Sequence, residues 1–161
     1  KILCAKFRKG HFEGVLDIMD RFIKIIKPTY VFMGEKDYQQ LFLIKNFIKY
    51  KYRSKIHPCK TIRDKNKVAL SSRNYLLTKK DLNTAGLISN VLFKVKSEIK
   101  IKHSMNNYLN LLKKNLIKKF KIKIEYLEIR NEKDLKKFNL KKNYRLFISY
   151  YINKVRLIDN F

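Results

Sequence analysis

Arginine and acidic residues are scarce in this 161-residue sequence, although its formal net charge at pH 7 is +26. Of the 39 basic residues, 8 are arginine and 31 are lysine, against 13 acidic residues. Arginine is the residue preferred for bidentate contacts to phosphates and bases, whereas lysine, asparagine and isoleucine share A/T-rich codons. We therefore assign most of the excess charge to solvated surface and expect no specific nucleic-acid partner. A basic nucleic-acid-binding module stays open as an alternative, for which only the net charge argues.

Cysteine and histidine are also few, and long apolar runs are missing. The two cysteines, Cys4 and Cys59, have no CxxC spacing, and the three histidines are scattered, so we assign no metal ligand to this chain. Two free thiols fit a reducing cytosol. No apolar run approaches the ~20 residues that span a bilayer, and no secretory segment is present. The sequence predicts a soluble, cytoplasmic protein without a membrane partner.

The first 61 residues alternate between helical and extended patterns. With 45% hydrophobic residues the chain can bury a core. A helix is predicted before Pro28 from four apolar residues at helical spacing, namely Val15, Ile18, Phe22 and Ile25. The run 30–33, apolar on both faces and followed by Gly34, is typical of a strand buried in a parallel sheet. A second helix is expected from about Asp37, and a second strand over 55–59. This order is the signature of a doubly wound α/β layer.

The remaining residues predict a different architecture. Residues 61–74 are polar and irregular, which indicates a loop and a domain boundary. Apolar periodicity predicts helices over about 79–99 and 105–120; the second is basic and amphipathic, and we favour packing on the domain over a membrane surface. KIKIEYLEI, YRLFISYYI and KVRLIDN read as strands, the last two joined by a tight turn at Asn153 and Lys154. The tail is therefore expected to be a small α+β unit.

Three clusters carry residues suited to chemistry. GEKDYQQL (34–41) follows the first strand, where ligands bind in open α/β sheets and a helix start attracts anions. Lys36 and Gln40 would share one face if the helix begins by Lys36; otherwise Asp37 is an ordinary cap. LSSRN (70–74) offers hydroxyls, a guanidinium and an amide to phosphate, or caps the next helix. In RKGHFEGV (8–15), His11 is a ligand contact or a satisfied loop histidine.

Together and in this order, these clusters resemble the pantothenate synthetase family. The family pattern reads roughly RPGHFxGV, FGEKDxQQL, RExDGLAxSSRNxYL and RLIDN. This chain has RKGHFEGV, MGEKDYQQL, RDKNKVALSSRNYLL and RLIDN (156–160). The resemblance covers essentially the whole chain. It implies the C-terminal portion of a Rossmann-like nucleotide-binding α/β domain (residues 1–61), followed by a small α+β domain of helices and antiparallel sheet (residues 62–161).

The resemblance also implies an activity, which is the condensation of pantoate with β-alanine to pantothenate. Pantoate attacks the α-phosphate of ATP to give pantoyl adenylate and pyrophosphate, and the amine of β-alanine then displaces AMP. ATP and Mg²⁺ are the implied cofactors, and a homodimer is the implied assembly. The catalytic set is implied to be Lys36, Ser71, Ser72 and Arg73.

Further roles are carried over residue by residue. The ATP site is implied to comprise Gly34, Glu35, Lys36, Asp37, Ile62 (through its backbone, to adenine), Leu70, Ser71, Ser72 and Arg73. Gln40 is implied to bind pantoate, with His11 and Arg8 bordering the acid-substrate pocket. Residues 70–73 are implied to form a mobile phosphate loop. Positioning and neutralisation of phosphate charge would carry the rate.

The sequence also departs from the family pattern. The family's HxGH motif lies before the first residue of this chain, so we expect an uncovered sheet edge and apolar face, and we expect these residues alone not to turn over at a useful rate. Lys9 replaces a proline, and Asn66 and Lys67 replace an Asp-Gly pair ahead of the serines. The alternatives to a ligase are a nucleotidyltransferase that acts on another acid, the basic module already described, and a degenerate fragment without function.

Overall fold

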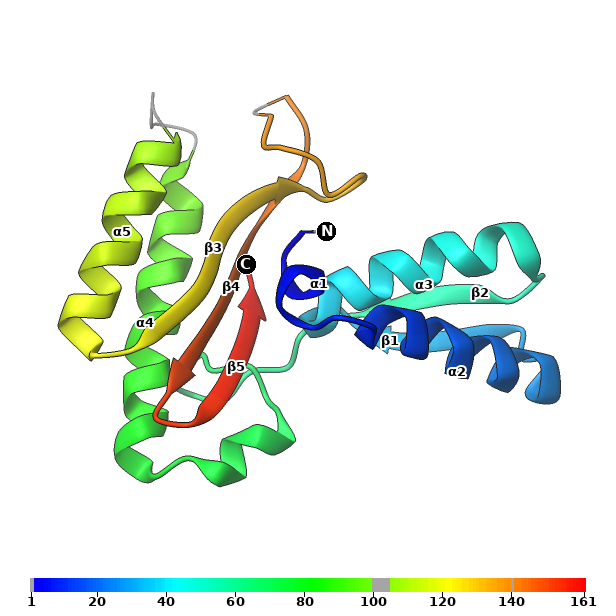
Figure 1. The fold of residues 1–161 in the computed structure, drawn as a ribbon, viewed down its shortest axis with the longest axis horizontal. Coiled ribbons are helices and arrows are strands. Elements are labelled where there is room, and N and C mark those ends of the chain that lie inside the picture. Colours follow the sequence, from blue (N-terminus) through cyan, green and yellow to red (C-terminus); the bar gives the residue numbers. More distant parts are fainter. Residues whose placement is uncertain (1, 100–104, 140) are drawn as a thin grey trace. The chain divides into compact units, whose positions relative to one another are not determined.

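The computed structural model describes residues 2–99, 105–139 and 141–161, which form two compact units, Lys1–Thr61 and Ile62–Phe161. Each unit has its own sheet and its own core (Figure 1). Unit 1 contains a parallel pair of strands, and unit 2 an antiparallel sheet of three strands. The predicted fold class, α/β followed by α+β, is confirmed.

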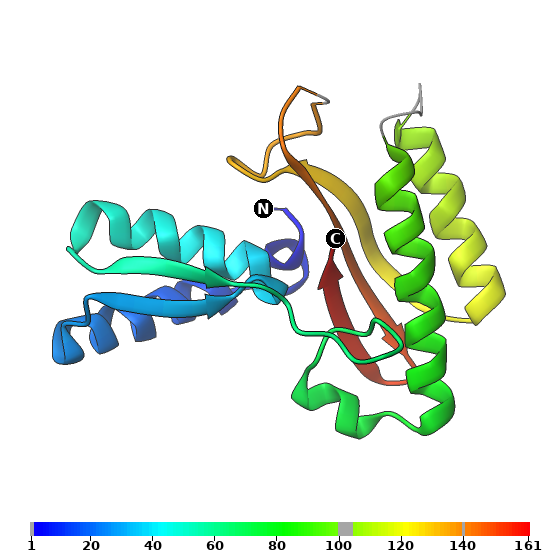
Figure 2. The same ribbon diagram turned by 180° about the vertical axis from the view of Figure 1, so that it is seen from behind.

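From α2 on, unit 1 follows the predicted order of helix, strand, helix and strand, and a short helix that was not predicted comes before it. Its elements are α1 (Cys4–Phe7), α2 (His11–Ile26), β1 (Tyr30–Gly34), the 3₁₀ turn η1 (Glu35–Asp37), α3 (Tyr38–Lys51) and β2 (Lys55–Cys59). The strands pair in parallel from Tyr30 opposite Lys55 to Gly34 opposite Cys59. Because α3 connects two parallel neighbours, it is the crossover helix of a βαβ unit. Figure 2 shows both strands from the side opposite Figure 1.

The core of unit 1 lies between the helices and one face of the strand pair. Ile23 of α2 meets Ile44 and Ile48 of α3, and all three are almost fully buried. Partly buried residues from both helices and both strands surround them, namely Val15, Leu16, Met19, Met33, Phe47, Tyr52 and Ile56. The helices of this unit are therefore held mainly by burial of a shared apolar stripe.

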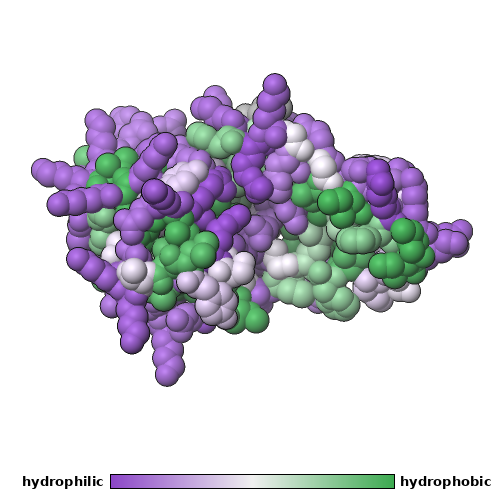
Figure 3. All heavy atoms as spheres, turned by 60° about the horizontal axis from the view of Figure 1, so that its bottom comes forward, coloured by the Kyte–Doolittle hydropathy of each residue, from purple (hydrophilic) through white to green (hydrophobic). Residues whose placement is uncertain are grey.

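The exposed surfaces of unit 1 correct one expectation. Helix α2 forms as predicted, and its residues Ile18, Phe22 and Ile25 are exposed, since α3 packs against the stripe that contains Ile23. Strand β1 is not buried on both faces, because Phe32 is 67% exposed while Met33 packs inward. Figure 3 shows hydrophobic side chains gathered on the surface of this unit. The expected uncovered apolar face is thus present in the described part of the chain.

Unit 2 packs two helices on a twisted antiparallel sheet. Its elements are η2 (Ser72–Leu76), α4 (Lys79–Glu98), α5 (Met105–Phe120), β3 (Lys123–Asn131), β4 (Tyr144–Ile152) and β5 (Val155–Asn160). The strand order is β3-β4-β5, and the two helices lie along one face of this sheet (Figure 1). The core joins Ile88 and Leu92 of α4 to Leu146 and Ile148 of β4, which are all fully buried. Alternation along the strands supplies these inward residues.

Two local features of unit 2 follow from particular residues. The turn between β4 and β5 falls at Asn153 and Lys154 as predicted, and Asn153 has φ of 52°, which asparagine tolerates better than most residues. Strand β3 carries a β-bulge at Glu125, since Ile124 pairs with Tyr150 and Tyr126 with Ser149. The bulge leaves Glu125 without a partner in the strand register.

Candidate functional site

The first predicted cluster lies at the carboxyl end of β1, where the chain turns into α3. Gly34 ends the strand with φ of −68° and ψ of 134°, and a Cβ built there would meet no heavy atom within 4 Å. The glycine therefore keeps open space beside the backbone. Glu35, Lys36 and Asp37 form the 3₁₀ turn that follows. A ligand at this end of the sheet would meet the start of a helix, where the macrodipole favours negative charge.

Lys36 is the cation of this cluster, and its side chain is only 16% exposed. Its Nζ lies 4.0 Å from a carboxylate oxygen of Asp37. The condition under which Lys36 and Gln40 share one helix face is not met, because the α-helix begins at Tyr38 and Lys36 lies in the preceding turn. Asp37 occupies the N-cap position of α3 without a capping hydrogen bond from its side chain, so the capping alternative is wrong.

The two neighbouring glutamines have different roles. Gln39 is buried, its Oε1 accepts from the amide of Cys4 at 2.9 Å, and its Nε2 donates to the carbonyl of Ile2 at 3.0 Å. This side chain ties the segment that contains α1 to the start of α3. The adjacent Gln40 is half-buried. Sequence reasoning missed Gln39, because an i, i+1 pair of glutamines gives no signal of which one turns inward.

Arg8 and His11 are brought together at the start of α2. Nη1 of Arg8 lies 2.7 Å from Nε2 of His11, and both residues are partly buried. A guanidinium can only donate, so this bond needs an imidazole whose Nε2 is unprotonated. The pair lies in unit 1, and Arg8 stands four residues after Cys4, whose amide donates to Gln39 at the start of α3.

The second cluster lies in unit 2, in what we call the serine loop (Leu70–Arg73). The carbonyl of Ile62 accepts from the amide of Leu70 at 2.9 Å, which joins two of the positions expected at ATP. Ser71 is extended and its Oγ accepts from the amide of Arg73 at 3.3 Å. Ser72 is exposed and begins the 3₁₀ turn η2. The loop thus presents hydroxyl, guanidinium and amide groups within one short segment.

The alternative of a helix cap at LSSRN holds only for that 3₁₀ turn. Helix α4 is capped by Thr78, whose Oγ1 accepts from the amide of Asp81 at 3.1 Å, while the Asp81 carboxylate accepts from the amide of Thr78 at 3.2 Å. This reciprocal pair is a capping box. The hydroxyl of Ser72 and the guanidinium of Arg73 are therefore not needed to start the helix.

The ordered hairpin ahead of the serine loop explains one departure from the family pattern. Lys67 has φ of 69°, the left-handed conformation that glycine adopts without steric cost. Asn66 makes the turn with it: its Oδ1 accepts from the amide of Val68 at 3.1 Å, and its Nδ2 donates to the carbonyl of Leu82 at 3.2 Å. The substitution of Asp-Gly by Asn66 and Lys67 therefore keeps the turn and adds backbone strain.

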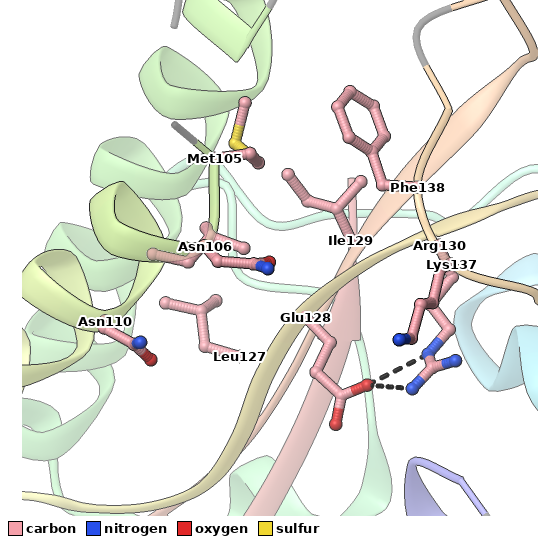
Figure 4. A pocket seen from close by; sticks show the side chains of 10 residues that line it. Met105, Asn106, Asn110, Leu127, Glu128, Ile129, Arg130, Lys137 and Phe138 are labelled. Carbon is pink, nitrogen blue, oxygen red and sulfur yellow. Dashed lines mark hydrogen bonds and ion pairs between the residues drawn. The ribbon is translucent and has the colours of Figure 1, made fainter. Parts of the chain in front are cut away.

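Metal-binding groups, membrane-spanning helices and cavities were sought among the described residues. No group of three His, Cys, Asp or Glu side chains in the described part of the chain is arranged to hold a metal ion. No helix within those residues is long and apolar enough to cross a membrane. A cavity of about 560 Å³ in unit 2 lies between α5, β3 and residues 137–138, and Figure 4 shows the ion pair of Glu128 and Arg130 on its wall. None of the predicted site residues lines it.

Known proteins resemble this chain over its whole length. The family model described as pantoate-beta-alanine ligase matches residues 1–161. A pantothenate synthetase from Flavobacterium psychrophilum is 38% identical over 160 residues, covering 97% of this chain and 56% of the relative. One from Francisella tularensis subsp. mediasiatica is 37% identical and is covered to 53% of its length. The chain therefore spans about half the length of the curated relatives it matches.

Solved structures give the same result. The crystal structure of pantothenate synthetase from Thermus thermophilus matches with a TM-score of 0.86 at 25% identity, over 99% of this chain and 59% of the other. The ligase from Francisella tularensis, complexed with beta-gamma ATP and beta-alanine, matches with a TM-score of 0.76 at 36% identity. It is covered to 53% of its length.

Proposed function

Because this chain belongs to the pantoate-β-alanine ligase family, we propose that it serves in the ATP-dependent condensation of pantoate with β-alanine. The observation that carries the proposal is the place of the GEKD turn. It follows the carboxyl end of a parallel strand and precedes a helix, with a half-buried lysine in the turn. This is the position at which open α/β sheets bind nucleotides.

The proposed reaction has two steps that balance without a redox partner. A carboxylate oxygen of pantoate attacks the α-phosphorus of ATP, an O–P bond forms, and the bond to the leaving pyrophosphate breaks. The amine of β-alanine then attacks the acyl carbon of pantoyl adenylate, a C–N bond forms, and AMP leaves as the amine loses a proton. Neither step needs a covalent intermediate on the protein, so positioning and charge neutralisation supply the rate.

The proposed roles follow from the chemistry of each group. Lys36 neutralises phosphate charge from the strand end, and Ser71, Ser72 and Arg73 donate to phosphate oxygens from the serine loop. Gly34, Glu35 and Asp37 are assigned to ATP at the strand end of unit 1, and the backbones of Ile62 and Leu70 are assigned to ATP in unit 2. Gln40 is assigned to pantoate, with Arg8 and His11 at the border of the acid-substrate pocket.

Mg²⁺ is proposed as a companion of the ATP phosphates. Mg²⁺ keeps several waters in proteins and is usually held by substrate phosphates and one or two carboxylates. This chain is assigned no metal ligand of its own, so the ATP phosphates would hold the ion. When bound, the ion would spread the negative charge that builds up on the phosphates. We further propose that the protein is located in the cytoplasm. We also propose that it assembles as a homodimer, which light scattering would test by measuring the molar mass in solution.

Pantoate-dependent ATP–pyrophosphate exchange tests the first step directly. We would measure it on this chain and on a fusion that adds the part of the Francisella tularensis relative that the chain does not match. We expect the fusion to exchange and Lys36→Ala to lower its rate at least 100-fold, because the ATP phosphates lose one of their proposed cations. Lys45→Ala is the matched control, since Lys45 is an exposed lysine on α3, and its rate should stay within twofold.

Other outcomes would redirect the assignment. A folded fusion without exchange would contradict the ligase proposal. Exchange with another acid and none with pantoate would favour a related nucleotidyltransferase. Salt-sensitive binding of nucleic acid without any effect of ATP would favour the basic module. Specific activity of the 161-residue chain close to that of a whole relative would overturn the expectation that these residues alone do not turn over.

A further inference from the structure

Arg63 lies nine residues ahead of Ser72 and makes more polar contacts than any predicted site residue in its unit. Its Nη1 and Nη2 donate to the two carboxylate oxygens of Asp159 at 2.7 and 2.9 Å. Nη2 also donates to the carbonyl of Asn160 at 3.0 Å, and Nη1 to that of Lys67 at 2.9 Å. The two side chains of the pair are 18% and 7% exposed. This is a bidentate, largely desolvated pair between residues 96 positions apart.

Two aromatic rings lie side by side against the same guanidinium. The centroids of Phe93 and Phe161 each lie 4.9 Å from its central carbon, and the two rings meet edge to face with centroids 4.8 Å apart. A planar guanidinium can satisfy its edges by hydrogen bonds and its faces by ring contacts at once. Arg63 is therefore held by contacts from β5, from α4, from Phe161 and from its own hairpin.

The element that Arg63 fixes is the hairpin 62–70. Arg63 pairs with Ala69 as an antiparallel bridge, the amide of Asp64 donates to the carbonyl of Val68 at 2.9 Å, and that of Leu70 donates to Ile62. The tip of the hairpin docks on α4 at Gly86, where an added Cβ would lie only 3.0 Å from Cβ of Asn66. The hairpin is thus tied to α4 at its tip and to β5 at Arg63.

The serine loop leaves this hairpin directly. Leu70 is the last hairpin residue and the first of the loop, and the Nδ2 of Asn74 bonds back to the carbonyl of Ala69 at 3.1 Å. The positions of the two hydroxyls and of Arg73 therefore depend on where the hairpin sits. The amide of Leu70 donates to the carbonyl of Ile62, and the backbone of Ile62 is expected at adenine. The position of this backbone therefore also depends on where the hairpin sits.

We propose that Arg63 is a positioning residue that, through its clamp on Asp159, fixes the hairpin and with it the serine loop for ATP phosphate. This rests on the proposed function, because it assigns the loop to phosphate. It also gives Asp159 of the RLIDN segment a role: the segment is the anchor for a loop that precedes it by more than 80 residues. The clamp touches no substrate and acts only through the loop.

The test compares two lysine substitutions that keep the charge. Arg63→Lys removes the fork and the ring contacts. Arg130→Lys is the matched control, since Arg130 makes a similar pair with Glu128 at 2.5 and 2.9 Å, is 17% exposed, and lies on β3. Hydrogen exchange of residues 62–76 is followed by mass spectrometry in both, with the β3 and β4 strands as the internal reference. We expect at least tenfold faster exchange of 62–76 in Arg63→Lys, unchanged strands, and no effect in Arg130→Lys.

The kinetic arm uses the fusion described above. We expect Arg63→Lys to raise the KM for ATP at least fivefold and to leave the KM for pantoate within twofold, since the serine loop is assigned to ATP phosphate and not to pantoate. A smaller folded fraction alone would lower the rate without changing the KM for ATP. Asp159→Asn, which keeps the shape and removes the charge, should give the same pattern if Arg63→Lys folds poorly.

Each contrary result is decisive for a different step. Unchanged exchange of 62–76 in Arg63→Lys would overturn the clamp. Faster exchange with an unchanged KM for ATP would overturn its link to the reaction. Absence of pyrophosphate exchange in the unsubstituted fusion would refute the proposed function and that link together, while the hydrogen-exchange comparison would still decide whether Arg63 holds the hairpin.

Discussion

The carboxylate of Glu125 is the acceptor at the centre of a polar cluster on the sheet of unit 2. It accepts from Oγ of Ser149 at 2.9 Å, from the hydroxyl of Tyr151 at 3.1 Å, and from Nε and Nη2 of Arg156 at 2.9 and 2.7 Å. The side chains of Glu125 and Arg156 are 9% and 14% exposed. The bulge in β3 gives Glu125 the freedom to reach all three donors.

The ionised form of Glu125 is favoured in the folded protein. Burial alone would raise the pKa of this carboxyl, but the hydrogen bonds from Arg156, Ser149 and Tyr151, with the charge of Arg156, outweigh burial and hold the pKa below its usual value. A depressed folded pKa contributes stability at every pH above the unfolded pKa of about 4.3. That contribution is lost as the pH falls through the lower, folded pKa.

Glu125→Gln tests this reading, because it keeps the shape and removes the charge. Removing one member of a buried ion pair costs about 3–5 kcal/mol, since the partner charge stays buried without compensation. The amide oxygen of glutamine still accepts one or two of the four hydrogen bonds, so we expect about 3 kcal/mol lower free energy of unfolding at pH 7. Glu128→Gln is the control on the same strand: Glu128 is 34% exposed, and its loss should cost at most about 1 kcal/mol.

Urea unfolding followed by circular dichroism at 222 nm measures both variants. The difference between Glu125→Gln and the unsubstituted chain should shrink as the pH is lowered below 4, because the unsubstituted carboxylate is then protonated. A loss below 1 kcal/mol for Glu125→Gln would refute the reasoning, and so would equal losses for the two variants or a difference independent of pH down to pH 2.

Two further predictions concern the hairpin turn and a buried lysine. Lys67→Gly should raise the free energy of unfolding by about 0.5–1 kcal/mol, because it relieves the positive φ of Lys67. Lys65→Gly removes the same charge at a residue without positive φ, so it should not raise the free energy of unfolding in the same urea titration. Equal gains for the two variants would contradict the prediction. Burial lowers the pKa of Lys96 to about 8, so the folded state binds fewer protons than the unfolded state between pH 8 and 10, and stability from this residue rises with pH across that window. Lys96→Met should therefore remove a pH-dependent rise of the unfolding free energy between pH 7.5 and 9.5, and parallel profiles of the two proteins would count against it.

The sequence by itself determined the local structure and the place of the motifs. Apolar spacing of 3.6 and 2 residues follows from backbone geometry, so it predicted the helices and strands of both units. Asn153 identified the turn between β4 and β5, since asparagine tolerates positive φ. Lys36 was identified because its motif directly follows a predicted strand, and Ser71 because its motif lies in a predicted loop. The activity expected of them came from resemblance.

Only the tertiary structure decided which of several apolar or polar residues make contacts. Helix α2 has apolar residues on two faces, and the packing of α3 selects Ile23 over Phe22 for the core. Gln39, next to Gln40, turns inward because the backbone of the α1 segment needs its two hydrogen bonds. Such choices depend on what lies opposite each side chain, which periodicity along the chain does not encode.

The clamp of Arg63 on Asp159 is the clearest case of this division. Both residues were visible within matched motifs, but no pattern joins positions 96 residues apart, and their pairing exists only because β5 and the hairpin meet in the fold. The left-handed turn at Lys67 was likewise visible only in the structure, because a lysine stands where glycine is favoured and gives no signal of a positive φ. Periodicity and turn residues in the sequence predict local geometry, whereas long-range contacts depend on how whole helices and strands pack together.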